Sequence, residues 1–112
     1  MKINKLHLQK CISCNGDTEK LDSNQITKNL NELRDWNLNE DNEMIFKKYN
    51  FKNFKKTLEF VNIIGEISEK EGHHPDLSFG YGYCIIMLHT HAIKGLSIND
   101  FILASKINLI NV

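Results

Sequence analysis

The feature that most constrains this chain is a long apolar stripe that ends in a glycine and a proline. Asn53 is a candidate N-cap for the helix that carries the stripe. Gly72 suits the left-handed position that closes a helix, and Pro75 prevents continuation beyond it. The apolar positions follow the i, i+3, i+4, i+7 spacing of one helix face: Phe54, Leu58, Phe60, Ile63, Ile64 and Ile67. The pattern predicts a helix from about 53 to 72.

Short extended segments flank this helix in pairs. The expected strands cover residues 36–39, 44–51, 76–80 and 83–90. The polar residues 40–43 predict one hairpin turn, and Gly80-Tyr81-Gly82 predicts the second. Two hairpins separated by a helix favour an antiparallel sheet with helices packed on one face. We therefore expect one β-hairpin before the long helix and one after it.

Two further helices complete the expected domain. Ser23 is the predicted N-cap of a first helix, whose apolar face carries Ile26, Leu30 and Leu33. Ser97 and Asp100 form an S-x-x-D capping box for a last helix, which runs through Phe101, Ala104, Ile107 and Leu109. The element order is α-β-β-α-β-β-α, an α+β fold with a four-stranded antiparallel sheet. Residues 1–20 show no clear period and are expected to form a loosely packed leader before a folded unit of residues 21–112.

The last expected strand is apolar on both faces. Cys84, Ile86 and Leu88 point to one side, and Ile85 and Met87 point to the other. A sheet covered by helices on one side should be polar on its other side. We therefore expect a second copy of the chain to cover Ile85 and Met87, so that the protein is a homo-oligomer, either a dimer or a tetramer.

Composition excludes several classes of protein. Lys plus Arg number 14 and Asp plus Glu number 14, so the basic excess of a nucleic-acid-binding protein is absent. No apolar run approaches the length of about 18 residues that a membrane span needs. The three cysteines, Cys11, Cys14 and Cys84, are an odd number without an export signal. They are expected to be reduced thiols in the cytoplasm.

Histidines are the candidate chemical groups. His73 and His74 are adjacent at the junction between a helix end and a strand, and Pro75 fixes the backbone behind them. His91 ends the last strand, and His89 lies two residues earlier and so faces the same side. Imidazole titrates near neutral pH and can give or take a proton. The cluster of His73, His74 and His91 predicts acid–base chemistry.

Metal and thiol chemistry are the alternatives. His73-His74 with His89-x-His91 offers imidazole ligands for zinc, but the spacing matches no strong metal signature. His7-x₃-Cys11-x₂-Cys14 is half of a zinc site. The same C-x-x-C is not preceded by a strand, unlike in thiol–disulfide enzymes, so that function is rejected. We expect no metal at the site.

The residues around the histidines resemble the pterin-4a-carbinolamine dehydratase family. The resemblance runs from about Leu21 to the C-terminus. It rests on the E-x-x-x-H-H-P block from Glu69 to Pro75, on Thr90-His91, and on Gly95-Leu96-Ser97-x-x-Asp100. Aromatic residues before the long helix follow the family pattern with altered spacing: Tyr49, Phe51 and Phe54. The family fold has the same α-β-β-α-β-β-α order.

The resemblance implies a hydro-lyase that acts on a pterin without a metal or organic cofactor. Such an enzyme dehydrates 4a-hydroxytetrahydropterin to quinonoid dihydropterin and so recycles tetrahydrobiopterin. By the match, His73 and His91 are the acid–base residues, and His74 completes the catalytic set by binding and orienting the pterin. The implied substrate-binding residues are Glu69, Pro75, Phe79 and Asp100. Glu69 is placed to hold an imidazole, and the capping box explains Asp100 equally well.

Departures from the family pattern concern the walls of the pocket. Leu77 and Ser78 stand where members often carry an aromatic residue, with Phe79 as a replacement. Lys94-Gly95 replaces a pair of glycines after the last histidine, and His89 matches no catalytic position. A rival function remains, because the family includes members that bind a transcription factor and stabilise its dimer. The chain would then be a non-catalytic dimerisation or coactivator module, with Ile85 and Met87 on the binding face.

Overall fold

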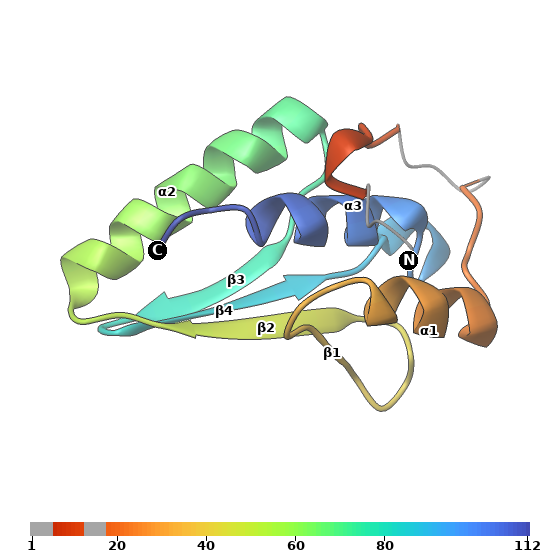
Figure 1. Ribbon diagram of the computed structural model, residues 1–112, viewed down its shortest axis with the longest axis horizontal. Coiled ribbons are helices and arrows are strands. Elements are labelled where there is room, and N and C mark those ends of the chain that lie inside the picture. The colour runs from red at the N-terminus through yellow and green to blue at the C-terminus, as the bar shows by residue number, and fades with distance from the viewer. Residues whose placement is uncertain (1–5, 13–17) are drawn as a thin grey trace.

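The computed structural model describes residues 6–12 and 18–112. Its sheet has the strand order β1-β2-β4-β3, with antiparallel neighbours throughout. Helices pack on one face of the sheet (Figure 1). The elements are η1 Leu6–Leu8, α1 Ser23–Asn31, β1 Asn37–Leu38, β2 Ile45–Asn50, α2 Phe54–Glu71, β3 Asp76–Gly80, β4 Tyr83–Leu88, η2 His91–Ile93 and α3 Ile98–Ile107. The predicted α+β class and the order of helices and strands are confirmed.

Helix α2 has the two ends that its sequence predicts. The Asn53 side chain accepts a hydrogen bond from the Lys56 backbone N–H at 2.9 Å. Gly72 adopts a left-handed conformation with φ 68°, and its N–H donates to the Ser68 carbonyl. This residue turns the chain out of the helix, so that the next residues leave α2 toward the sheet. The end of α2 therefore fixes where the His73-His74 pair begins.

The apolar stripe of α2 is only partly buried. Phe60 and Ile64 are in the core, whereas Phe54, Leu58 and Ile63 are exposed. The apolar face that the sequence predicts is therefore not buried as a whole. The buried face of the helix is rotated toward polar positions, namely Thr57, Ser68 and Glu71. The hydroxyl groups of Thr57 and Ser68 donate to backbone carbonyls one turn earlier, and these hydrogen bonds offset the cost of burying them.

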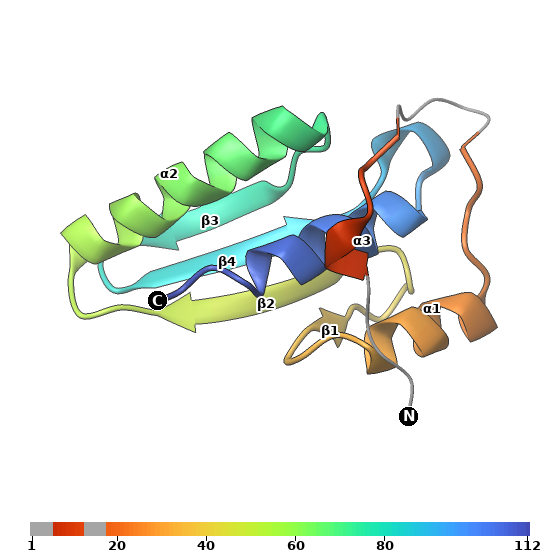
Figure 2. The ribbon, with the colours of Figure 1, turned by 45° about the horizontal axis from the view of Figure 1, so that its top comes forward.

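Strand β4 separates the covered face of the sheet from the open one. Cys84, Ile86 and Leu88 are completely buried beneath the helices. Ile85 and Met87 alternate with them and are partly exposed on the other face. Figure 2 shows α2 and α3 side by side above the sheet, and no helix of residues 6–12 and 18–112 lies across its opposite face. The predicted two-sided apolar character of this strand is confirmed.

Two predicted boundaries at caps are corrected. The N-cap of α1 is Asp22 and not Ser23, because the Asp22 carboxylate accepts from the Gln25 N–H at 2.8 Å while the Gln25 side chain accepts from the Asp22 N–H at 2.9 Å. The last helix ends at Ile107 and does not reach Leu109. Each correction moves a boundary by one or two residues.

The predicted strand 83–90 is also too long. β4 ends at Leu88, and Thr90 forms an isolated bridge with Gly95, its N–H donating to the Gly95 carbonyl at 2.8 Å. The short turn η2 lies between these two residues. His91 therefore sits at the start of a closed loop rather than in a continuing strand.

The described part of residues 1–20 contacts the last helix. Leu6 and Cys11 are buried at 4% and 7% exposure. The Ile12 N–H donates to the Asn99 side-chain oxygen at 3.0 Å, and the Asn99 amide donates back to the Ile12 carbonyl. Loose packing is therefore wrong for these residues, while the division into a leader and a domain stays a prediction. Cys14 and the Asn15-Gly16-Asp17 turn lie outside the described residues.

An ion pair joins the end of α2 to α3. Lys106 Nζ lies 2.6 Å from Glu71 Oε2, and the Cys11 N–H donates to Glu71 Oε1 at 2.9 Å. Burial raises the pKa of Glu71, but the bonds from Lys106 and Cys11 lower it by more, so the net pKa lies below its ordinary value. The charged form of Glu71 is thus favoured in the folded protein.

A Lys106→Met variant is expected to lose about 1–3 kcal/mol of unfolding free energy near neutral pH, because the buried carboxylate loses its charged partner. A depressed folded-state pKa gives stability that is present above the unfolded pKa of 4.5 and is lost as the pH falls through the lower folded value. The difference between variant and wild type should therefore shrink below pH 4.5. Urea unfolding at several pH values measures it. Lys56→Met, which breaks the exposed pair with Glu59, is the control and should change little.

Candidate active site

The register of β3 and β4 brings two histidine-bearing segments together. Asp76 pairs with Met87 in the antiparallel ladder. This is the last pair of the ladder, so His73 and His74 come just before it in the chain on one side, and His89 and Thr90 come just after it on the other. The segment that leaves α2 therefore runs beside the end of β4. The candidate site is built at this end of the sheet.

A buried carboxylate, that of Asp100, forms hydrogen bonds with several residues of the candidate site. Asp100 is completely buried, and its Oδ1 lies 2.7 Å from His73 Nε2. Its Oδ2 accepts from the Thr90 hydroxyl at 2.8 Å and from the Ser97 N–H at 3.0 Å. His73 itself is 6% exposed. Asp100 thus ties the first histidine, the residue before His91 and the start of α3 into one network.

The two sequence interpretations of Asp100 are therefore compatible. The predicted capping box between Ser97 and Asp100 is present at the start of α3. The same carboxylate also holds an imidazole of the predicted catalytic set, through its other oxygen. Because a carboxylate accepts and does not donate, His73 Nε2 carries the proton in this bond. The capping box with Ser97 positions Asp100, and Asp100 in turn positions His73.

His74 lies on the surface beside a carboxylate. Its Nε2 bonds to Glu69 Oε2, and the two side chains are 57% and 79% exposed. Glu69 therefore contacts His74, whereas the buried Asp100 contacts His73. The left-handed residue Gly72 separates the helix from the two histidines, whose side chains bond to different partners. The adjacent imidazoles thus have different surroundings, one buried and one in solvent.

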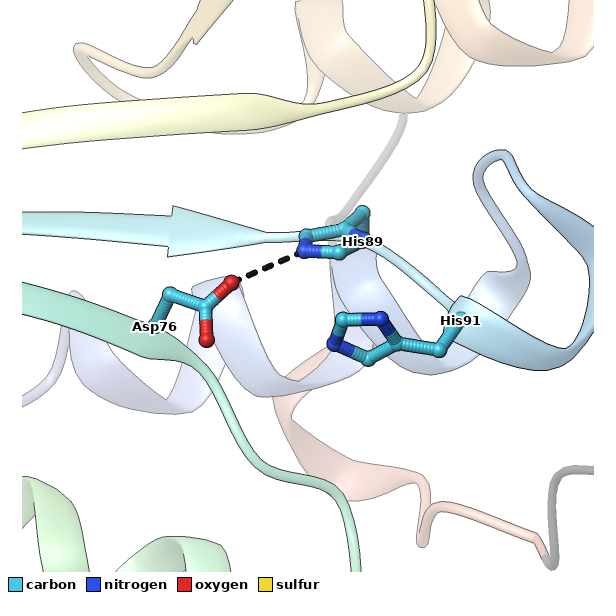
Figure 3. A group of neighbouring side chains, drawn as sticks. All are labelled: Asp76, His89 and His91. Carbon is cyan, nitrogen blue, oxygen red and sulfur yellow. Dashed lines mark hydrogen bonds and ion pairs between the residues drawn. The ribbon is translucent and has the colours of Figure 1, made fainter.

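His91 lies on the surface next to His89. The two rings are 4.1 Å apart and meet edge to face at 63°. His89 Nε2 lies 2.9 Å from Asp76 Oδ2 on the neighbouring strand. Figure 3 shows the side chain of His91 reaching back toward His89 and Asp76. His89 continues the alternation of Ile85 and Met87, whereas His91 begins the turn η2 and reaches the same cluster through its side chain.

His89 and Asp76 are the residues of this cluster that the predicted set omits. The His-x-His alternation indicated that His89 and His91 share a face. Nothing in the order of residues indicated Asp76, because its neighbour depends on the strand register. Ligand atoms of Asp76, His89 and His91 all lie within 4.8 Å of one another, which is the spacing of a possible metal site in the described part of the chain.

A hollow of about 340 Å³ opens beside His91. It lies between the end of β4 and the loop that joins β1 to β2. Its lining consists of Asn39, Glu43, Met44, His89, His91, Lys94 and Gly95. This hollow gives His91 a concave surface on which a small molecule can contact the imidazole.

Comparison with known proteins identifies the family. The model of the family described as pterin 4 alpha carbinolamine dehydratase matches residues 19–110. A Legionella pneumophila protein provisionally named pterin-4-alpha-carbinolamine dehydratase is 48% identical over 99 residues, which cover 88% of each chain. A Halorhodospira halophila protein with the same provisional name is 42% identical and covers 88% of this chain and 90% of its own.

The chain belongs to the pterin-4a-carbinolamine dehydratase family. Solved structures agree with this assignment. A Brucella melitensis protein described as a transcriptional coactivator/pterin dehydratase superposes with a TM-score of 0.76 at 27% identity, over 80% of this chain and 96% of that one. A pterin dehydratase-like protein described as a RuBisCO assembly factor of the α-carboxysome gives 0.58 at 25% identity, over 67% and 87%.

The departures from the family pattern fall in different places. Lys94 lines the hollow beside His91, so this departure puts a charged side chain next to the candidate site. Its φ of 51° lies in the left-handed region, where glycine is favoured. The replacement of a family glycine by Lys94 thus leaves a strained backbone next to the site.

The structure does not bring Phe79 to the histidine cluster. Phe79 stands three residues along β3 from Asp76, about 10 Å at the usual rise of a strand. The odd spacing turns its side chain to the opposite face from Asp76. Leu77 shares that opposite face, and Pro75 lies partly buried between His74 and the start of β3. The substrate-binding role of Phe79 and Pro75 stays a prediction.

None of the helices in residues 6–12 and 18–112 combines the length with the apolar character that crossing a bilayer requires.

Proposed function

We propose that this protein catalyses the dehydration of 4a-hydroxytetrahydropterin to quinonoid dihydropterin, as a step in tetrahydrobiopterin recycling. The family match over residues 19–110 supports the substrate class. The observation that carries the proposal is the convergence of the two histidine-bearing segments at one end of the sheet. The cytoplasm is the proposed location, because the cysteine content suits a reducing compartment.

The reaction is a loss of water that needs two proton transfers. The bond from C4a to the hydroxyl oxygen breaks, and a proton delivered to that oxygen lets it leave as water. The neighbouring ring nitrogen gives up its proton, and its electron pair forms the new double bond to C4a. No oxidation or reduction takes place, so histidines are chemically sufficient for both steps.

His91 and His73 are the proposed acid–base residues. His91 is exposed beside the hollow, where a substrate reaches it without rearrangement. His73 is nearly buried, and the Asp100 carboxylate bonded to its Nε2 holds the imidazole in position. Thr90 couples their positions, since its hydroxyl bonds to the same carboxylate and its backbone leads directly into His91.

His74 and Glu69 are proposed to bind and orient the pterin. The pair is exposed and lies next to His73 in the chain, where it offers both hydrogen-bond donors and acceptors. A pterin ring carries the complementary amide and amine groups along one edge. Neither residue is required for folding, because both side chains project into solvent.

The direct test is the decay of synthetic 4a-hydroxytetrahydropterin, followed by ultraviolet absorbance. We expect catalytic amounts of the protein to accelerate the decay over the buffer rate. Equal rates with and without protein would refute the proposed function.

A second function is supported by the uncovered face of the sheet. Ile85 and Met87 are partly exposed there in the single chain. A coactivator-like module, as described for the Brucella neighbour, would use such a face for protein binding. The same face suits a homo-oligomer of this chain.

Light scattering at micromolar concentration tests the homo-oligomer. We expect a dimer or a tetramer, because association covers the apolar side chains. Met87→Lys should shift the population toward the monomer, since it places a charge on the covered face. Asn62→Lys, at an exposed polar position of α2 on the other side of the molecule, is the control and should affect the oligomer less. A strictly monomeric wild type would contradict the expectation.

A further inference from the structure

Asp76, His89 and His91 form a cluster that the proposed reaction does not use as a unit. His91 has a proposed role in proton transfer, but His89 and Asp76 have none. Asp76 begins β3, His89 follows the last residue of β4, and His91 begins the turn η2. One imidazole nitrogen from each histidine and one carboxylate oxygen lie within 4.8 Å of one another.

This donor set has the composition of a transition-metal site. Two imidazoles and one carboxylate suit Zn²⁺ and its neighbours in the first row, whereas Mg²⁺ and Ca²⁺ prefer oxygen ligands. A tetrahedral ion at about 2.0–2.2 Å from each ligand separates its ligand atoms by about 3.3 Å. The bond of 2.9 Å between His89 and Asp76 already approaches this separation. Small rotations of exposed side chains are therefore enough to bring His91 into the same sphere.

The surroundings leave room for an ion with an open position. Asp76 and His91 are exposed, and His89 has 25% of its side chain exposed, so an ion reaches all three from solvent. The hollow beside His91 offers space for a water as the fourth ligand. Lys94 opposes a cation there, while Glu43 in the same lining offsets its charge. Ligation through His89 Nε2 requires its proton to move to the other ring nitrogen, as a neutral imidazole allows.

We propose that Asp76, His89 and His91 bind a Zn²⁺-class divalent ion, and that the bound ion inhibits the enzyme by occupying an imidazole nitrogen of His91. The ion is an inhibitor and takes no part in the reaction. Binding of the ion goes beyond the proposed function, whereas inhibition rests on it. The two halves are measured separately.

Binding is tested by calorimetric titration of the full chain, without a histidine tag and under reducing conditions, with Zn²⁺. We expect one equivalent to bind. His89→Ala and Asp76→Asn should each weaken binding by at least about 10–100-fold, a loss that removal of an outer-shell partner already causes. His74→Ala is the matched control, because His74 is also an exposed histidine beside a carboxylate but lies outside the cluster. Its affinity should equal that of the wild type.

Cobalt provides a check on the ligands. Co²⁺ in place of Zn²⁺ should give visible bands of nitrogen and oxygen ligation without a thiolate charge-transfer band. A thiolate band would place the ion at a cysteine and overturn the proposal. Absence of binding, or equal affinity in wild type and His89→Ala, would overturn it as well.

Inhibition is tested in the dehydration assay with Zn²⁺ and with Mg²⁺. We expect Zn²⁺ alone to slow the wild type, and His89→Ala to resist it. If Zn²⁺ binds but the wild type keeps its full rate, the inhibitory half is wrong and the proposed function stands. If the protein has no activity without metal, the proposed function fails while the binding result is unaffected.

Discussion

A His91→Ala variant is expected to dehydrate 4a-hydroxytetrahydropterin about 10²–10⁴-fold more slowly than the wild type, the usual effect of losing a positioned acid–base group. The loss should appear in kcat, because the imidazole acts on protons that move in the transition state. His91 is exposed at the start of η2, so its truncation removes no core contact. Stopped-flow absorbance gives the rate, and the urea midpoint should stay that of the wild type.

His89→Ala is the matched control for this loss. It removes the other imidazole of the same face, whose ring centre is 4.1 Å from that of His91, and the proposed reaction does not use it. Its rate in metal-free buffer should stay within a few-fold of the wild type. The double variant His73→Ala, His91→Ala should approach the uncatalysed rate. Full activity in the double variant would show that these histidines are not the acid–base pair.

Much of the fold was predictable because its helix caps and turns depend on local sequence. Asn53, Gly72 and the turn around Gly82 act through the backbone of their own neighbours, and the structure places each as predicted. The end of β4 was not predictable, because it depends on a bridge from Thr90 to Gly95 that closes the η2 loop. Burial along α2 was not predictable either, because it also depends on contacts with other elements. Which side of a helix faces the sheet is decided by packing, and packing buried Thr57 and left Ile63 outside.

The candidate site was predictable where the signal lies in short motifs. The E-x-x-x-H-H-P block and Thr90-His91 indicated the end of the sheet at which the candidate site lies. The partners of each histidine were not predictable in the same way. Glu69 is nearer in sequence to His73, one helical turn away, and yet it contacts His74, while His73 turns to the buried Asp100. Asp76 meets His89 through strand register, a tertiary relation that no local pattern contains.

An Asp100→Ala variant is expected to be the most damaging single change to stability, at about 3 kcal/mol or more. The carboxylate accepts from His73 Nε2, the Thr90 hydroxyl and the Ser97 N–H, all on buried residues. Each buried polar group left without its acceptor costs about 1–3 kcal/mol. For a domain of this size the melting temperature should fall by roughly 10 °C or more. Thermal and urea unfolding followed by circular dichroism measure the loss.

Asp22→Ala separates this effect from the loss of a helix cap. Asp22 also belongs to a capping box, but its hydrogen bonds are exposed, so its removal should cost only about 1 kcal/mol. Asp100→Asn provides a folded comparison if the alanine variant does not express. It keeps one acceptor oxygen but presents an N–H group to the network, so an intermediate loss of stability is expected. Equal losses from Asp22→Ala and Asp100→Ala would mean that the buried network adds nothing beyond the cap.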